Sequence, residues 1–373
     1  MDFNGLLQLM IEKNASDLFI SADVEPSMKI NGQILPVTKT KLNPEIIAQL
    51  IQSIMTEKQR DEFARTRECN FAITDREKTA RFRVSAFQQR DMPGMVLRKI
   101  ETRIPTPEAL KLPPILKELS MTKRGIILFV GATGTGKSTS LASLVGYRNH
   151  NSRGHIITVE DPIEFIHQHA GCIITQREVG IDTDSFEVAL KNTLRQAPDV
   201  ILIGEIRSRE VMDYAVAFAE TGHLVFATLH ANNANQALDR VIHFFDADRH
   251  NQLYMDLSLN LKAIIAQQLV PTKDGKGRRA AVEVMINTPL MQDYIRKGEI
   301  HELKDLMKRS RELGMQTFDQ ALYDLYKAGE ISYEDALKHS DAPNDLRLQI
   351  KLAESDAHHL IGESGKGLFI QDY

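Results

Sequence analysis

The sequence predicts an α/β protein of two domains, a small N-terminal α/β domain and a larger domain built on a parallel sheet. A chain of 373 residues is long for one compact domain, so two are expected. From residue 124 onward, short apolar runs alternate with segments suited to helices, as in parallel sheets buried on both faces. A glycine-rich segment at residues 131–138 stands between one such run and the next helical segment.

The composition is that of an ordinary globular chain. It is 42% hydrophobic and 26% charged, which excludes a long disordered or collagen-like protein. The net charge of -4 provides no positive field that would attract nucleic acid or anionic lipid. Cys69 and Cys172 form no CxxC pair, so neither a zinc module nor a disulfide framework is expected. A cytoplasmic protein is expected, because the thiols are read as reduced, the N-terminus is unlike a signal peptide and no long apolar run occurs in the sequence.

The first hundred residues mix helical and strand-like stretches. Residues 3–13 have apolar side chains at helical spacing, and residues 43–64 favour helices. Strands of an antiparallel sheet are expected at residues 17–21, 27–31 and 81–87, with a tight hairpin turn at Asn31 and Gly32. The proline-rich passage that follows indicates a hinge or linker.

In the second half, apolar runs predict buried strands at residues 126–130, 155–159, 200–203 and 224–228. Beyond about residue 250 the pattern is mostly helical, apart from residues 279–286, and the polar end of the chain favours a poorly ordered tail. We therefore expect five parts: an N-terminal domain (1–103), a linker (104–116), a core (117–290), a helical C-terminal subdomain (291–340) and a tail (341–373).

The glycine-rich segment is a full match to the phosphate-loop pattern GxxxxGK[ST]. Glycines let the backbone N–H groups approach phosphate oxygens, and the following helix N-terminus adds a favourable dipole. Lys137 would contact the β- and γ-phosphates, and the Ser138 hydroxyl would bind Mg²⁺. A chance glycine-rich turn is disfavoured by the preceding apolar strand. The residues predicted to bind ATP here are Gly131, Thr133, Gly134, Thr135, Gly136, Lys137, Ser138 and Thr139.

Two acidic positions follow predicted strands. Glu205 ends the apolar run that begins after Asp199, at the edge where doubly wound sheets bind ligands, and Gly204 stands where an aspartate is usual. Glu205 is expected to hold Mg²⁺ or to orient the attacking water, with a solvated strand-end glutamate as the alternative. Glu164 is a candidate general base, although an exposed turn fits its surrounding sequence equally well.

Histidines and arginines supply further candidates. His230 follows the strand at residues 224–228 and would sense the γ-phosphate, although a lone histidine is more often structural. Metal binding by the histidines lacks a supporting cysteine or carboxylate pattern. Residues 76–103 hold eight Lys or Arg against three acidic residues. Because few aromatic residues are present to stack bases, arginine fingers are an equally physical use of this segment.

These motifs resemble the secretion ATPase superfamily, the traffic ATPases of type II and type IV secretion and of type IV pili. Its four boxes match in order: Walker A at residues 131–138, the Asp box at 155–164, Walker B at 194–207 and the His box at 221–230. Residues 14–18 and 313–319 are typical of the retraction ATPases, the PilT/PilU family. The four-cysteine zinc element of assembly and secretion members does not occur in this sequence.

The resemblance implies a PAS-like N-terminal domain and a RecA-like P-loop ATPase domain with a helical C-terminal extension. It also implies a hexamer with ATP between subunits, working at the inner face of the inner membrane at the pilus base. The implied activity is ATP hydrolysis for pilus retraction and twitching motility. The implied partners are an inner-membrane platform protein and a PilT-like paralogue, without nucleic acid or direct membrane insertion.

Family roles then fall on individual residues of this chain. Arg83 and Arg98 match the arginines that the N-terminal domain contributes. Glu164 and Glu205 match the catalytic carboxylates, and His223 and His230 match the His box, with His223 at the nucleotide and His230 catalytic.

Three departures from PilT favour the accessory PilU type. The element that PilT proteins need for retraction is altered at residues 291–299, Ser208 replaces a common aspartate, and the tail beyond Asp341 is longer. Three alternatives stay open. They are a nucleotide-binding adaptor with weak hydrolysis that acts through a PilT-like partner, a pilus assembly or type II secretion ATPase, and a nucleic-acid motor, which the net charge and the lack of Trp disfavour.

Overall fold

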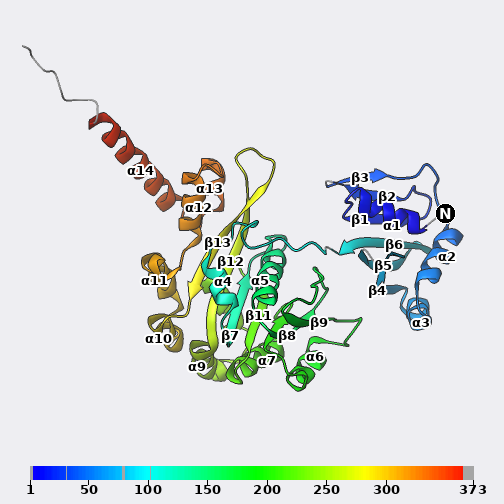
Figure 1. The fold of residues 1–373 in the computed structure, drawn as a ribbon, viewed down its shortest axis with the longest axis horizontal. Helices are drawn as coiled ribbons and strands as arrows, with labels where there is room; N and C mark the ends of the chain where they lie inside the picture. Colours follow the sequence, from blue (N-terminus) through cyan, green and yellow to red (C-terminus); the bar gives the residue numbers. More distant parts are fainter. Residues whose placement is uncertain (1–2, 31, 78–79, 101, 364–373) are drawn as a thin grey trace, which may run out of the picture. The chain divides into compact units, whose positions relative to one another are not determined.

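The computed structural model describes residues 3–30, 32–77, 80–100 and 102–363 (Figure 1). The chain divides into two compact units. The first contains Met1–Ile104, Thr158–His169 and Ile174–Asn192. The second contains Pro105–Ile157, Ala170–Ile173 and Thr193–Tyr373.

The N-terminal part of the first unit is a six-stranded antiparallel sheet with strand order β3-β2-β1-β6-β5-β4. Its elements are α1 (Phe3–Glu12), β1 (Asp17–Ser21), β2 (Ser27–Ile30), β3 (Gln33–Pro36), α2 (Pro44–Ile54), α3 (Glu57–Thr66), β4 (Glu68–Thr74), β5 (Arg81–Gln89) and β6 (Met92–Ile100). The predicted strands and helices of this region are confirmed. Ile30 pairs with Gln33 across the predicted hairpin, of which Asn31 lies outside the described residues.

Local chemistry explains where these helices begin. The Asn43 side chain accepts the backbone N–H of Ile46 before α2, and Pro44 occupies the first turn. Thr56 and Gln59 form a reciprocal capping box at the start of α3. Alternate residues of β5 point into a core that includes Leu18 and Phe71. The opposite face of β5 therefore presents its polar side chains.

The second sheet has seven strands in the order β13-β12-β7-β11-β10-β8-β9. Its strands are β7 (Gly125–Val130), β8 (Gly154–Glu160), β9 (Cys172–Glu178), β10 (Val200–Ile203), β11 (Leu224–Leu229), β12 (Leu261–Pro271) and β13 (Arg278–Ile286). β12, β7, β11 and β10 pair in parallel, whereas β13 runs antiparallel to β12. Every residue of β7 and β10 is buried, as the continuous apolar runs predicted.

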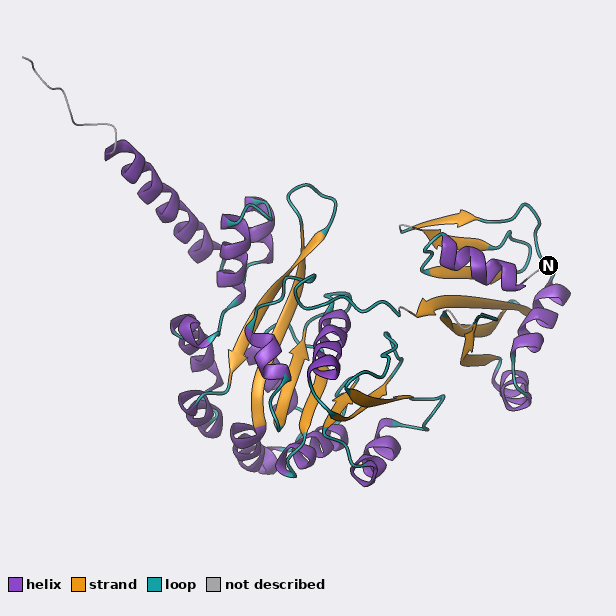
Figure 2. Ribbon diagram, viewed as in Figure 1, coloured by secondary structure: helices purple, strands orange, loops and turns teal. Residues whose placement is uncertain are grey.

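The remaining helices lie around the strands of the second sheet, except that the last one extends away from it (Figure 2). They are α4 (Ile115–Ser120), α5 (Lys137–Asn151), α6 (Phe186–Thr193), α7 (Arg209–Glu220), α8 (Ala234–Ile242), α9 (His250–Asn260), α10 (Pro289–Lys297), α11 (Leu303–Arg309), α12 (Phe318–Lys327), α13 (Tyr333–His339) and α14 (Pro343–Glu363), with short 3-10 turns η1 (Leu194–Gln196), η2 (Ala247–Arg249), η3 (Ile300–Glu302) and η4 (Arg311–Leu313). Within the described ranges, no helix is long and apolar enough to cross a membrane.

The structure differs from the sequence prediction in two places. The prediction of helix beyond about residue 250, apart from 279–286, was wrong over β12, an eleven-residue strand. Its apolar run pairs with β7 on one side and β13 on the other, and this pairing decides between a strand and a buried helix. In the polar tail the structure has α14, whose Leu346 and Ile350 are buried.

Candidate nucleotide-binding site

The predicted phosphate loop leaves the carboxyl end of β7 and leads directly into α5. At two positions of the loop only glycine fits, because Gln267 lies too close to leave room for a side chain. A Cβ at Gly131 would lie 2.6 Å from the Gln267 backbone oxygen, and a Cβ at Gly136 would lie 2.7 Å from Gln267 Nε2. Gly136 also has a φ of 85°, which L side chains rarely adopt. The loop therefore packs against β12 in a shape that only glycine permits at these two positions.

Gln267, which the sequence motifs did not indicate, supports this loop from β12. Its buried side chain donates from Nε2 to the Thr135 carbonyl oxygen at 2.8 Å. Its Oε1 accepts the Ser140 hydroxyl at 2.8 Å. One carboxamide thus fixes the loop to the first turns of α5, and no sequence pattern could reveal a contact that joins positions so far apart in the chain.

Lys137 is folded onto the loop. Its Nζ donates to the carbonyl oxygens of Gly131 at 2.6 Å and Ala132 at 2.8 Å. Burial lowers the pKa of Lys137, and the negative charge of Glu205 opposes that shift. The ammonium group and the glycine-rich backbone together provide the positive surroundings that an anionic phosphate requires.

Glu205 follows β10 and meets the predicted His box. Its Oε1 lies 3.2 Å from His230 Nε2, and its Oε2 accepts Arg207 Nε at 2.7 Å. The Thr228 hydroxyl donates to the Gly204 carbonyl oxygen, which holds the ends of β10 and β11 together. The structure therefore brings Glu205 and His230 together in the second unit. Lys137 belongs to the same site, because the charge of Glu205 acts on its pKa.

Beside the loop is a cavity of about 480 Å³. It is lined by Ala132, Thr133, His230, Ala231, Asn232, Gln236 and Arg240. Its walls thus come from the phosphate loop, the His box and α8. The loop, Lys137 and a carboxylate at the strand end have the chemistry of a site for a nucleotide with a divalent cation.

Comparison with known proteins identifies the family. The family model described as "Type II/IV secretion system protein" matches residues 2–338. The chain belongs to this secretion ATPase family. It is 72% identical over 361 residues to "Type IV pilus ATPase PilU" of Pseudomonas aeruginosa. The matched residues cover 96% of this chain and 94% of the relative. The resemblance stated from the motifs, including its PilU character, is therefore confirmed.

Two further similarities concern PilT. The chain is 39% identical over 346 residues to "Type IV pilus retractation ATPase PilT" of Pseudomonas aeruginosa, covering 93% of this chain and all of the relative. It also resembles the "Crystal Structure of the Pilus Retraction Motor PilT and Bound ADP", with a TM-score of 0.87, 38% identity and coverage of 93% and 99% of the two chains. The predicted combination of an N-terminal α/β domain and an ATPase domain is confirmed by this match.

The Asp box of this secretion ATPase covers most of β8 and the first residues of the loop after it. The loop belongs to the first unit. Gln176 of β9 fixes this loop, because its Nε2 donates to Glu160 Oε1 at 3.2 Å and to the Phe165 carbonyl oxygen at 2.9 Å. Its Oε1 accepts the backbone N–H of His167 at 2.8 Å. Burial raises the pKa of Glu160 to about 7. Glu164, the candidate base, stands within the loop that Gln176 fixes.

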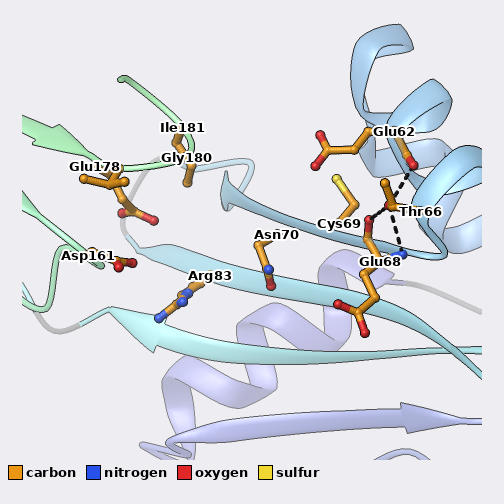
Figure 3. Close-up of a pocket in the computed structure, with 11 residues that line it drawn as sticks. Glu62, Thr66, Glu68, Cys69, Asn70, Arg83, Asp161, Glu178, Gly180 and Ile181 are labelled. Atoms are coloured by element: carbon orange, nitrogen blue, oxygen red, sulfur yellow. Dashed lines mark hydrogen bonds between the residues drawn. The ribbon is translucent and has the colours of Figure 1, made fainter. Parts of the chain in front are cut away.

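Arg83 and Arg98 lie directly opposite each other on β5 and β6. Arg98 Nε contacts Asp17 Oδ1 at 2.8 Å, although the Arg98 side chain is 64% exposed. Arg83 lines a cavity of about 330 Å³ in the first unit, together with Asp161 and Glu178 (Figure 3). Burial raises the pKa of Glu178, and the charge of Arg83 partly offsets that shift. The two arginines predicted as a pair are thus brought together in register.

His223 is not brought to the phosphate loop within the subunit. It precedes β11 and its carbonyl oxygen accepts the Gly125 N–H at 3.0 Å, at the amino end of β7. The loop follows the carboxyl end of the same strand. Thr133 lines the cavity, whereas Ser138 and Thr139 lie in the first turn of α5. Among the described residues, no group of His, Cys, Asp and Glu is arranged to hold a metal ion by itself.

Proposed function

We propose that this chain is an ATP-hydrolysing motor of the PilU type that powers or assists type IV pilus retraction and twitching motility. The observation that carries the proposal is a cavity lined by the phosphate loop and by His230, whose side chain contacts Glu205. It occurs in a chain 72% identical to a type IV pilus ATPase.

The reaction would be hydrolysis of ATP to ADP and phosphate. The loop N–H groups and Lys137 would bind the β- and γ-phosphates, and Lys137 would exchange its two carbonyl contacts for phosphate oxygens. Ser138 and Glu205 would hold the Mg²⁺ that accompanies ATP and neutralises phosphate charge. Glu164 would act as the general base, from a loop fixed by Gln176.

His230 would report the state of the γ-phosphate through its contact with Glu205. Arg83 and Arg98 would contact the nucleotide of the neighbouring subunit in a hexamer. Two like charges opposite each other on adjacent strands repel, and an anionic phosphate between them would remove that repulsion. Nucleotide turnover would then change the angle between domains around the linker at residues 105–114.

The proposed setting is the inner face of the inner membrane at the pilus base. There the ring would act on a platform protein of that membrane and together with a PilT-like paralogue. A strain that lacks this chain and is complemented by wild type or by Lys137→Ala tests the proposal. Retraction or twitching restored by the wild type alone is expected. Equal restoration by both would contradict an ATP-driven role.

A second candidate is an adaptor that binds nucleotide, hydrolyses it weakly and acts through the PilT-like partner. One observation favours it. In α10, at the position of the altered retraction element, Arg296 and Lys297 both pair with Asp293 of the same helix. Both basic side chains of that surface are therefore held by a carboxylate of the same helix. A wild-type oligomer that binds ATP but shows negligible phosphate release would support the adaptor.

A further inference from the structure

A buried carboxylate outside the family motifs joins the nucleotide cavity to the C-terminal helices. Glu283 lies on β13 and is 1% exposed. Its Oε1 accepts the backbone N–H of Ala234 at 2.8 Å, and its Oε2 accepts the backbone N–H of Phe318 at 3.4 Å. Each of these donors is the first residue of a helix. One side chain thus satisfies N–H groups that have no partner within α8 or α12.

The first contact fixes a wall of the nucleotide cavity. Ala234 lies four residues beyond His230, the last residue of the His box, and begins α8, which supplies Gln236 and Arg240 to the cavity. Asn233 caps the same helix by accepting the Gln236 N–H at 3.0 Å. A displacement of α8 by bound nucleotide would therefore change the contact between the Ala234 N–H and the Glu283 carboxylate.

The second contact leads into the C-terminal helices. Phe318 begins α12, and the next residue, Asp319, is nearly buried. The Asp319 carboxylate accepts the Ser340 hydroxyl at 2.7 Å and the backbone N–H groups of Asp341 at 2.8 Å and Ala342 at 3.2 Å. These three residues immediately precede α14. Hydrogen bonds to Glu283 and to Asp319, joined by the chain link from Phe318 to Asp319, thus connect the cavity wall to the start of α14.

We propose that Glu283 is a positioning residue that couples the nucleotide cavity to α12 and to the start of α14. The inference rests on the proposed binding of nucleotide at the phosphate loop. The buried carboxylate accepts N–H groups from two helices. If one helix moves and the carboxylate moves with it, either the second helix must move as well or one of its N–H groups loses its acceptor. Closure of the α8 wall on nucleotide is therefore transmitted to the amides at the start of α12.

Hydrogen exchange of the full-length protein, with and without ADP, tests the coupling. In the wild type, ADP should slow amide exchange at residues 131–138 and, by about fivefold or more, at the start of α12. Glu283→Gln keeps the shape of the side chain but turns one acceptor into an NH₂ group that faces a donor. In this variant the slowing at the loop should persist, and the slowing at α12 should fall below about twofold.

Two further variants make the test specific. Glu302→Gln removes a half-exposed carboxylate of η3 and should behave as the wild type. Asp319→Asn interrupts the series one step later, so ADP should still slow exchange at the start of α12 but no longer at residues 341–346. This variant keeps the coupling testable if Glu283→Gln does not fold.

The outcomes separate the two proposals. Slowing at the loop of the wild type without any change at α12 would overturn the coupling alone. Unchanged slowing at α12 in folded Glu283→Gln would also overturn it. No slowing at residues 131–138 of the wild type would contradict nucleotide binding at the loop, and with it both the proposed function and the coupling.

Discussion

The imidazole Nε2 of His230 lies 3.2 Å from the Oε1 of Glu205. This contact joins the acidic end of β10 to the end of β11, beside a cavity that the phosphate loop also lines. Glu205 is the more enclosed partner, with a side chain 17% exposed against 43% for His230. A carboxylate that also contacts Arg207 is held in a defined position before any ligand binds.

Replacement of Glu205 by Gln should lower phosphate release by about a hundredfold or more, because the negative charge that would hold the cation or orient water is lost. Nucleotide binding, which depends on the loop, should be retained. Steady-state phosphate release and binding of a fluorescent ATP analogue measure the two effects. Glu220→Gln is the matched control. Turnover within twofold of the wild type in Glu205→Gln would refute the assigned role.

The support that Gln267 gives to the loop is testable against its neighbour on the same strand. Gln267→Leu leaves the Thr135 carbonyl oxygen and the Ser140 hydroxyl without their partner. The free energy of unfolding should fall by about 1–3 kcal/mol, and the KM for ATP should rise. Gln268→Leu is the control, because Gln268 contacts His339 instead. Equal effects of the two variants on KM would contradict a specific role for Gln267.

The pH dependence of stability should carry a contribution from Glu283, because burial raises its pKa from 4.5 to about 7. Below pH 4.5 the carboxyl is protonated in the folded and the unfolded chain. Between these values only the unfolded chain loses the proton, so stability falls as pH rises and levels off above about 7.

The loss expected from Glu283 is about 3 kcal/mol, measured as the difference between denaturant unfolding at pH 5 and at pH 8. Glu160, whose pKa burial also raises to about 7, adds a similar slope. The comparison of wild type with Glu283→Gln therefore isolates Glu283. An identical pH dependence in both proteins would contradict the prediction.

The two arginines that face each other should differ in their effect on stability. Removal of Arg83 takes away a like charge that stands opposite Arg98 on the adjacent strand. Arg83→Ala should therefore be as stable as the wild type within about 0.5 kcal/mol, or more stable. Arg98→Ala removes the partner of nearly buried Asp17 and should cost about 1 kcal/mol, a small value because Arg98 is largely exposed.

Both arginine variants should lose turnover if they serve a neighbouring nucleotide. Thermal unfolding and phosphate release of the oligomer provide the two readouts. Loss of turnover together with intact stability in Arg83→Ala is the decisive pattern. A destabilised Arg83→Ala with proportionate loss of activity would indicate a purely structural residue.

The sequence could predict those strands whose apolar runs are continuous. β7 and β10 were predicted because each is buried on both faces and carries no polar residue in its centre. β12 was missed because Gln267 and Gln268 interrupt its apolar run, and only pairing with β7 and β13 decides its conformation.

The candidate site shows the same division. The loop, Glu205 and His230 each follow from a local motif, since the chemistry of phosphate binding constrains neighbouring residues. The contact of Gln267 with Thr135 and the two contacts of Glu283 join distant parts of the chain. No local pattern distinguishes such residues from ordinary strand positions, so the structure was needed to find them.

The central claim is that this chain hydrolyses ATP at the phosphate loop with Glu164 as base. Phosphate release from the purified full-length protein at its oligomeric size, beside Lys137→Ala and Glu164→Ala, tests it most directly. The prediction is steady turnover by the wild type and its loss in both variants, each of which remains folded. Negligible turnover by a wild-type oligomer that binds ATP, or full turnover by either variant, would contradict the claim.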